Sequence, residues 1–333
     1  MAGCSCGKGA TSATATADAQ SDSVAVSVSA QFSADSAYRN VAAQLDFGPR
    51  NPGSEGHSRC RQYLVAELQR YGADTVAVQQ TEVKIHTGAT VPCYNITASF
   101  NPQAKKRILL AAHYDTRPWA DEDADAANHS RPIPGANDGA SGVAVALELA
   151  RLIGQQKPGV GVDILLTDVE DSGLTGSQEQ EASEEAAETQ EEGEDTWCLG
   201  TQYWARNNGY TAATRPSFGI LLDMVGGRDA LFYREYLSER IAPVVNAKIW
   251  QAAARLGIGR FVDEIRGAVT DDHLYIASAG IPCADIIECA NPYTGNFPAY
   301  WHTMADNLDN IDRSTLADVG RTVAYVIYNE PAN

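Results

Sequence analysis

Apolar and polar residues follow two different spacings along this chain, and the change of spacing predicts the order of its elements. Residues 35–45 and 57–71 are typical of two helices around the turn GPRNPGSEG, the second of them ended by Gly72. Period-two alternation of polar and apolar residues then predicts two strands at 75–85 and 94–100. Strands of this kind suit a hairpin at the edge of a mixed sheet.

From residue 107 onward, short apolar runs alternate with helical segments. We expect strands at 107–112, 162–167, 217–224 and 284–288, and helices at 141–153, 199–207, 238–256 and 314–329. Another short segment lies near Asp271, and Gly257 marks the end of the helix before it. Strands that alternate with helices predict an α/β domain, with a mixed, mostly parallel open sheet and helices on both faces.

The domain organisation follows from length and composition. At 333 residues, 44% of them hydrophobic, the chain is long enough for one large domain with an extensive core. We expect that domain at 34–333, after a flexible tether at 1–33 that is rich in Ser, Thr, Ala and Asp. An acidic insert at 178–195 contains nine Glu or Asp residues and no Lys or Arg. We interpret the insert as a solvated loop. The more specific alternative is a lid over the site.

Charge and apolar runs limit the partners. A formal net charge of −18 argues against a nucleic-acid partner, because phosphate binding needs clustered Lys and Arg. No run approaches the roughly 20 apolar residues of a membrane span. Ala2-Gly3-Cys4 resembles the end of a bacterial lipoprotein signal, which predicts a lipid anchor at Cys4 and a periplasmic or membrane-anchored location. An arbitrary terminus explains these residues equally well. The seven cysteines include no CxxC pair and leave the redox compartment open.

Side chains that can bind metals follow several of the predicted strands. His113 and Asp115 follow the run RILLAA, Glu170 and Asp171 follow VDILLTDV, and Asp223 follows FGILL. The carboxyl ends of parallel strands form one rim where ligands bind, so we expect these side chains to converge. Imidazole and carboxylate are zinc ligands, and an adjacent carboxylate can stay free as a base. The sequence therefore predicts a zinc enzyme.

Two further candidates complete this set. Asp138 lies in the Gly-rich turn PGANDGASG before an apolar helix, where it could cap the helix. Gly139 and Gly142 of that turn would also allow the backbone to approach a bound ion closely. His302 lies in the segment WHTMADN near the end of the chain. Asp306 of the same segment is expected to form a local turn.

Six segments of the chain resemble the zinc-dependent aminopeptidase family, which is built on a mixed-sheet α/β fold. In order over residues 35–333 they are GPRNPGSEG, AAHYDTR, PGANDGASGVAVALELAR, LLTDVEDSG, ILLDMVGG and WHTMADNLDNID. Two features resemble the glutaminyl cyclase branch, namely Asp271-Asp272-His273 and a Trp301 directly before the last histidine. That branch converts the N-terminal Gln of peptides and proteins to pyroglutamate and releases ammonia. Glu-Asp in place of the animal enzymes' Glu-Glu suggests a bacterial member and shortens the ligand at position 171.

The resemblance implies a role for each candidate residue. A cyclase needs no metal-bound hydroxide, because the attacking group is the substrate's own α-amine, so we expect one zinc per chain as a Lewis acid. Holding the folded-back substrate can be worth roughly 7–11 kcal/mol in such ring closures. The expected catalytic residues are Glu170, Asp223 and Asp271; the metal ligands are Asp138, Asp171 and His302; the substrate-binding residues are Trp301, Phe297 and His273; and His113 and Asp115 lie behind the ligands or hold a second metal.

Two alternatives belong to different classes. A two-zinc aminopeptidase that releases N-terminal amino acids is favoured if His113 and Asp223 bind a second ion, since water then becomes the nucleophile. A non-catalytic binding module with the same fold is disfavoured, because every metal-binding and acid–base position holds a residue able to perform that role. The histidines at 57, 86 and 129 have no such support, and we interpret them as surface or turn residues.

Overall fold

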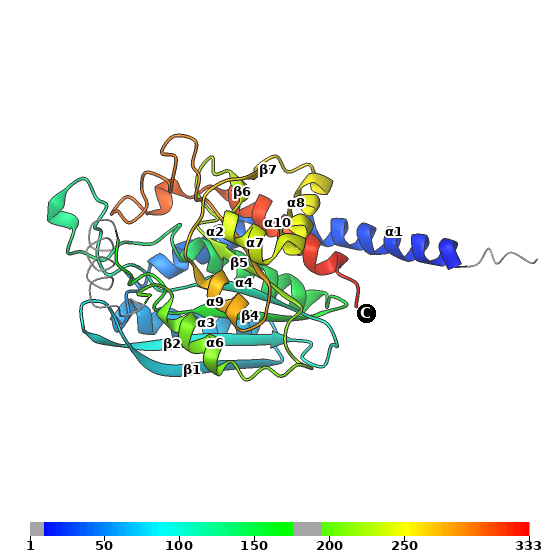
Figure 1. The fold of residues 1–333 in the computed structure, drawn as a ribbon, viewed down its shortest axis with the longest axis horizontal. Coiled ribbons are helices and arrows are strands. Elements are labelled where there is room, and N and C mark those ends of the chain that lie inside the picture. Colours follow the sequence, from blue (N-terminus) through cyan, green and yellow to red (C-terminus); the bar gives the residue numbers. More distant parts are fainter. Residues whose placement is uncertain (1–9, 176–194, 333) are drawn as a thin grey trace, which may run out of the picture.

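The computed structural model describes residues 10–175 and 195–332, which form a sheet covered by helices (Figure 1). Six strands are hydrogen-bonded in the order β1-β2-β4-β3-β5-β8. Their bounds are β1 Thr75–Lys84, β2 Thr90–Phe100, β3 Arg107–His113, β4 Gly161–Thr167, β5 Phe218–Asp223 and β8 Cys283–Ile287. β1 at the edge and β2 beside it form an antiparallel hairpin, and β2 pairs antiparallel with β4, whereas β4, β3, β5 and β8 run parallel. The predicted mixed sheet and its edge hairpin are confirmed.

Helices cover both faces of this sheet, as the sequence predicts. The helices are α1 Ala10–Ser29, α2 Ala34–Leu45, α3 Glu55–Arg70, α4 Ala140–Gln155, α6 Leu199–Asn207, α7 Tyr236–Ile241, α8 Pro243–Leu256, α9 Asp272–Ser278 and α10 Arg313–Asn329, with single 3₁₀ turns at Ala126–Asn128 and Leu308–Asn310. Successive residues of β3 point to opposite sides, so Leu110 packs into the core under α2, α4 and α10. Leu109 packs instead with Trp204 of α6 and Ile276 of α9. Both faces are therefore dry, which explains why β3 is buried at every position.

The helix predicted at 238–256 is interrupted. α7 ends at Ile241 and α8 begins at Pro243, with Ala242 between them at φ −139° and ψ 46°. Proline has no N–H to continue the first helix but is well suited to the first turn of the second. Two short strands that the sequence did not predict, β6 Phe232–Arg234 and β7 Phe261–Ile265, form a separate parallel pair beside these helices.

The N-terminal segment differs from the expected flexible tether. Residues 10–29 form α1, which packs along α10 and extends away from the body (Figure 1). Ala25 and Val28 are buried in this contact, and Asp22 bonds to Tyr325 of α10. The Ser-, Thr- and Ala-rich composition gave no sign of this contact, because few apolar residues make it. Residues 1–9, with Cys4, lie outside the described residues, as does the acidic insert up to residue 194.

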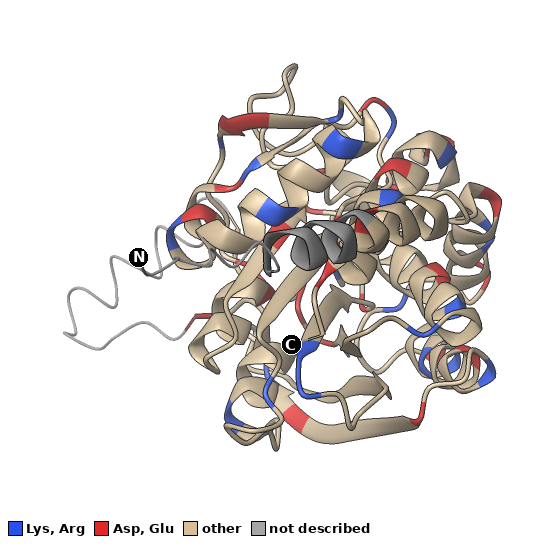
Figure 2. Ribbon diagram, turned by 90° about the vertical axis from the view of Figure 1, so that its right-hand side faces the viewer, with Lys and Arg blue, Asp and Glu red and all other residues tan. Residues whose placement is uncertain are grey.

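Two surface features bear on partners. No helix among the described residues is long and apolar enough to cross a membrane. On the side from which α1 projects, acidic and basic residues are interspersed (Figure 2).

Candidate active site

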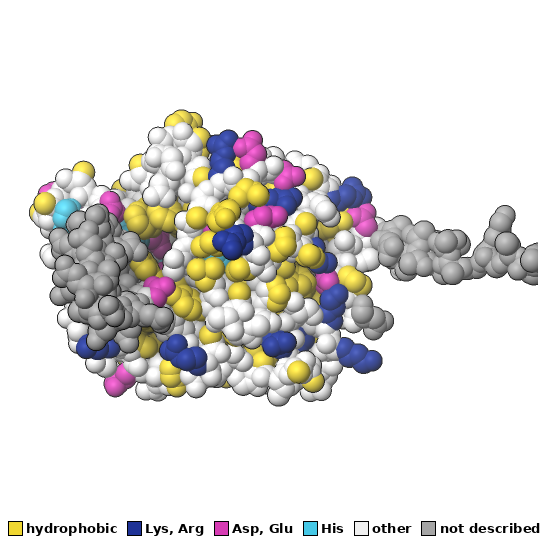
Figure 3. Space-filling model, viewed as in Figure 1, with side chains coloured by type: hydrophobic (Ala, Val, Ile, Leu, Met, Phe, Trp, Pro, Cys, Tyr) yellow, Lys and Arg dark blue, Asp and Glu magenta, His cyan; other side chains and the backbone are white. Residues whose placement is uncertain are grey.

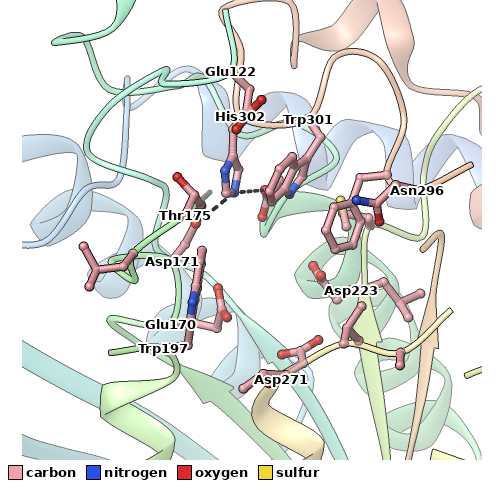
Figure 4. A pocket seen from close by; sticks show the side chains of 18 residues that line it. Glu122, Glu170, Asp171, Thr175, Trp197, Asp223, Asp271, Asn296, Trp301 and His302 are labelled. Atoms are coloured by element: carbon pink, nitrogen blue, oxygen red, sulfur yellow. Dashed lines mark ion pairs between the residues drawn. The ribbon is translucent and has the colours of Figure 1, made fainter. Parts of the chain in front are cut away.

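A cavity of about 520 Å³ lies at the carboxyl ends of the parallel strands. Asp223 ends β5, Glu170 and Asp171 follow β4, and Asp271 precedes α9. Hydrophobic and acidic side chains border the hollow on the surface (Figure 3). In the close-up, Glu170 and Asp171 point into the cavity from one side, whereas Asp223 and Asp271 face them from the other (Figure 4). The predicted convergence at the sheet's rim is present in the structure.

Asp138, Asp171 and His302 form a group of three ligand atoms that all lie within 4.8 Å of one another. His302 Nε2 lies 3.1 Å from Asp171 Oδ1 and 3.6 Å from Asp138 Oδ2 (Figure 4). Asp171 Oδ2 is buried without a hydrogen-bond partner among the described residues. Two carboxylates and an imidazole in this arrangement match the donor set of a catalytic zinc, which leaves a coordination position for substrate. The residues therefore fit a zinc ion.

The imidazole of His302 is prepared for this role. Burial, together with the nearby Arg117 guanidinium, lowers the pKa of His302 to about 3, so the ring stays neutral and keeps a lone pair. Trp301 stacks on the ring with centroids 3.5 Å apart, and Trp197 lies parallel to it at 6.2 Å. Asp121 Oδ1 lies 3.8 Å from the other ring nitrogen, Nδ1. Nε2 is thus the ring nitrogen that faces the carboxylates of Asp138 and Asp171.

Asp306 holds the loop that carries Asp138. Its carboxylate accepts hydrogen bonds from the backbone N–H groups of Asn137 and Asp138, at 2.8 and 3.0 Å. This buried role replaces the local turn expected from the sequence. Gly139 and Gly142 differ from expectation too: a Cβ at Gly139 would lie 2.7 Å from Asp115 O, and one at Gly142 only 2.0 Å from Leu222 O. The glycines make room for neighbouring backbone rather than for an ion.

His113 and Asp115 lie behind the ligands. His113 Nε2 lies 3.1 Å from both Asp138 Oδ1 and Asp223 Oδ1, and these three residues form a second ligand group that shares Asp138. Burial lowers the pKa of His113, but hydrogen bonds to the surrounding carboxylates outweigh it and raise the pKa well above its usual value. Asp115 accepts hydrogen bonds from the backbone N–H groups of Glu170 and Asp171, each at 3.2 Å. It therefore fixes the strand end on which both carboxylates stand.

Three buried carboxyl groups face the cavity beside the ligand group. Burial raises the pKa of Glu170 well above its usual value, and the negative charges of Asp271 and Asp171 add to that effect. Burial likewise raises the pKa of Asp271 well above normal and that of Asp223 to about 6. Carboxyl groups this close do not all ionise, so protons are shared among them. The cluster can accept and return a proton near neutral pH.

An aromatic wall closes one side of the cavity. Phe297 and Trp301 lie with ring centroids 4.4 Å apart and pack on Met224, Val269 and Ile287. Both predicted aromatic residues line the cavity. This wall, next to the carboxyl cluster, forms a compact apolar surface for a short substrate side chain.

The prediction that His273 binds substrate is wrong. His273 is fully buried, with Nε2 at 3.4 Å from Glu235 Oε2 and Nδ1 at 3.8 Å from Asp285 Oδ2. Asp271 caps the N-terminus of α9 and faces the cavity. Two residues further along a helix, the side chain points roughly 200° away, because each residue turns the helix by about 100°. The sequence did not reveal where the helix begins.

Sequence reasoning missed two residues at the site and misplaced one buried residue outside it. Trp197 lines the cavity, and Cys198 Sγ lies 3.4 Å from Glu170 Oε1. Both lie just beyond the acidic segment, outside the segments that resemble the aminopeptidase family. His57, interpreted as a surface or turn residue, is buried and bonds to Asp168 at 2.9 Å. Its helical spacing from Cys60 and Leu64, three and seven residues further along α3, was the available signal.

The backbone is strained around the cavity. Val169, Cys198, Met224 and His302 have φ between 47° and 56°, which is rare for residues with a side chain. Each is a site residue or the neighbour of one. Such strain persists only where surrounding contacts enforce it, and it commonly accompanies functional sites.

The sequence pattern of peptidase family M28 matches residues 95–192 and 189–327. These segments cover more than two thirds of the chain. With its zinc-type ligand group at the carboxyl ends of a mixed sheet, the chain belongs to peptidase family M28.

Within that family the chain is a relative of the glutaminyl cyclases. It is 48% identical to the glutaminyl cyclase of Bacteroides thetaiotaomicron, with a TM-score of 0.82 over 90% of this chain and 99% of that one. The glutaminyl cyclase of Tannerella forsythia is 44% identical over the same shares, with a TM-score of 0.82. The glutaminyl-peptide cyclotransferase of Bos taurus is 27% identical over 82% of this chain and 76% of its own. A Bacteroides thetaiotaomicron structure described as a leucine aminopeptidase precursor is 47% identical, with a TM-score of 0.81 over 90% of this chain and 98% of that one.

Proposed function

We propose that this protein converts the N-terminal glutamine of peptides and proteins to pyroglutamate and releases ammonia. One observation carries the proposal: the aromatic wall of Phe297 and Trp301 stands beside the carboxyl cluster of Glu170, Asp223 and Asp271, and Trp301 stacks on His302 of the zinc-type ligand group. A pocket with this shape holds a short amide side chain folded back on its own amine. Similarity to glutaminyl cyclases over nine-tenths of the chain supports the same reaction.

Asp138, Asp171 and His302 would hold one zinc ion. A bound zinc would act as a Lewis acid on the γ-carbonyl oxygen of the substrate glutamine. Asp306 and Asp115 support the ligands by fixing the backbone on which Asp138 and Asp171 stand. Such supporting contacts commonly matter nearly as much as the ligands themselves.

Glu170 accepts a proton from the attacking α-amine and returns one to the departing ammonia. Burial raises its pKa, so the carboxyl group holds the proton more readily between its service as a base and its service as an acid. Asp271 and Asp223 share protons with it and orient the leaving nitrogen. Trp301 and Phe297 hold the glutamine side chain in the folded-back conformation, where ring closure needs little further ordering.

A two-zinc aminopeptidase is the second candidate, because His113, Asp138 and Asp223 form another ligand group. The chemistry of the reaction favours one zinc: the substrate amine is an internal nucleophile, so no second metal has to activate water.

Incubation with a Gln-initiated peptide and with Leu- and Ala-anilides separates the candidates. A cyclase releases ammonia from the first and leaves the anilides intact. An aminopeptidase releases free amine from the anilides, and that result without ammonia would reject the cyclase.

We also propose a lipid anchor at Cys4 and a bacterial, periplasmic setting. Ala2-Gly3-Cys4 supports it through its resemblance to a lipoprotein signal end. Metabolic labelling with a tritiated fatty acid, compared between the natural chain and Cys4→Ala, tests the anchor.

A further inference from the structure

Cys198 is the last residue before α6 and touches the side chain proposed as the proton carrier. It is fully buried, and its Sγ lies 3.4 Å from Glu170 Oε1. Thiols elsewhere in the described residues make weaker contacts: those of Cys93, Cys283 and Cys289 lie 3.9 Å from backbone carbonyl oxygens. Among the described cysteines, Cys198 thus stands out by its contact with a carboxylate.

The backbone around Cys198 is fastened to the strand end that carries Glu170. Cys198 N–H donates to Glu170 O, and Leu199 N–H donates to Val169 O, each at 3.0 Å. Gly200 packs so closely that a Cβ there would lie 1.9 Å from Asp168 O. Cys198 itself has φ 56°, a conformation that a non-glycine residue keeps only where contacts enforce it. The thiol is therefore held in a fixed place relative to the Glu170 carboxyl group.

While Glu170 is ionised and acts as the base, its carboxylate can only accept, so the thiol must be the donor in this contact. Burial raises the pKa of the Cys198 thiol well above its usual value, and the charge of Glu170 raises it further, so the thiol stays protonated. A protonated thiol can donate S–H to a carboxylate oxygen. The described residues offer the Glu170 carboxyl oxygens no other hydrogen-bond donor. His113 Nδ1 is the next nitrogen, 3.8 Å from Oε2.

We propose that Cys198 is a positioning residue whose thiol holds Oε1 of Glu170 and so directs the other oxygen toward the reacting amine. This role rests on the function proposed above. A carboxyl group that must take a proton from one nitrogen and deliver it to another works best when a single rotamer is populated. The thiol supplies that restraint without adding a charge to a pocket already crowded with carboxylates.

The test compares Cys198→Ala, which removes the donor, with Cys198→Ser, which keeps one. Cys60→Ala is the matched control, since Cys60 is a fully buried cysteine on α3. Measurements are kcat and KM for a Gln-initiated peptide, zinc per chain and the thermal midpoint. We expect Cys198→Ala to lower kcat roughly 5- to 20-fold, in keeping with a single weak hydrogen bond to a charged group. KM and zinc content should stay near natural values, Cys198→Ser should recover most of the rate, and Cys60→Ala should leave kcat unchanged.

Several outcomes would overturn the role. A kcat in Cys198→Ala equal to that of the natural protein would show that the contact does not contribute to catalysis. Equal losses in the Ala and Ser variants, or a loss of zinc in both, would point to packing alone. If the natural protein releases amino acids instead of ammonia, the proposed function fails by itself. The same variants then decide the role of Cys198 on that activity, because Glu170 stays the proton carrier in both reactions.

Discussion

The indole ring of Trp301 stacks on the imidazole of His302, with ring centroids 3.5 Å apart and planes inclined by 22°. Trp301 thus forms part of the aromatic wall, while its neighbour His302 belongs to the zinc-type ligand group. The left-handed φ of His302, 54°, is what lets consecutive side chains stack in this way. Substrate pocket and metal site are joined by a single peptide bond.

Replacement of Trp301 should weaken catalysis without removing zinc. Trp301→Ala loses the apolar wall and should lower kcat/KM roughly 10- to 100-fold, mostly through KM. Trp301→Phe keeps a ring over His302 and should lose less. Tyr236→Ala, at an exposed aromatic residue, is the control. Unchanged kinetics in Trp301→Ala would remove this residue from the substrate pocket.

Substitutions of the neighbours Glu170 and Asp171 should impair the enzyme in different ways. Glu170→Gln removes the proton carrier, so kcat should fall about 10²- to 10⁴-fold while zinc stays bound. Asp171→Asn weakens a ligand, so zinc content should drop and added zinc should restore part of the rate. Kinetics and elemental analysis on the same samples check both. Zinc loss in Glu170→Gln with zinc retained in Asp171→Asn would exchange the two roles.

Elemental analysis of the purified protein should give one zinc per chain. Chelation should abolish activity, and a single equivalent of zinc should restore it, because one ligand group provides the Lewis acid. Full recovery only after a second equivalent would favour the two-zinc aminopeptidase. In that case His113→Ala should remove one of two zinc ions, whereas in the cyclase it should only weaken the binding of the single ion through its contact with Asp138.

Glu288, at the end of β8, should make stability depend on pH. Burial raises the pKa of Glu288 to about 7, although the hydrogen bond from Asn291 opposes the shift. Between its unfolded pKa and about 7 the folded state binds more protons than the unfolded one, so this contribution falls as pH rises. The free energy of unfolding of the natural protein relative to Glu288→Gln should drop by about 2–3 kcal/mol from pH ~4.5 to pH ~7.5. Urea unfolding at several pH values measures it, and a constant or rising difference contradicts it.

Deletion of residues 178–194 should leave the domain folded. The segment is acidic and has little apolar surface to bury, so its loss should change the thermal midpoint by only a few degrees. Circular dichroism and thermal unfolding of the shortened chain test this. A loss of the cooperative transition would show that the insert is part of the fold.

The parts of the site carried by strands could be predicted from the sequence. Apolar runs locate β3, β4 and β5, and the residues that follow them must meet at one rim. Asp115, Glu170 and Asp223 were found in this way. Asp138 and His302 lie on turns, where no periodicity places them, and only the resemblance of whole segments identified them.

The predictions that failed concern residues whose positions depend on tertiary contacts or on where a helix starts. His273 was misplaced because its direction is set by the capping of α9 at Asp271. Trp197 and Cys198 reach the site through a turn with left-handed backbone, which no composition rule predicts. The break between α7 and α8 is different. It could have been predicted, since a proline inside a helical pattern, here Pro243, is a visible signal.

The packing of α1 on α10 ties the first described helix to the last one. Phe32, just after α1, lies so close to Gly320 that a Cβ there would come within 2.1 Å of its ring. A shortened chain beginning at residue 34 would therefore retain the whole cavity yet strip the cover from α10. Its newly bared apolar stripe would favour self-association. The N-terminal segment therefore covers an apolar face of α10 far from the cavity.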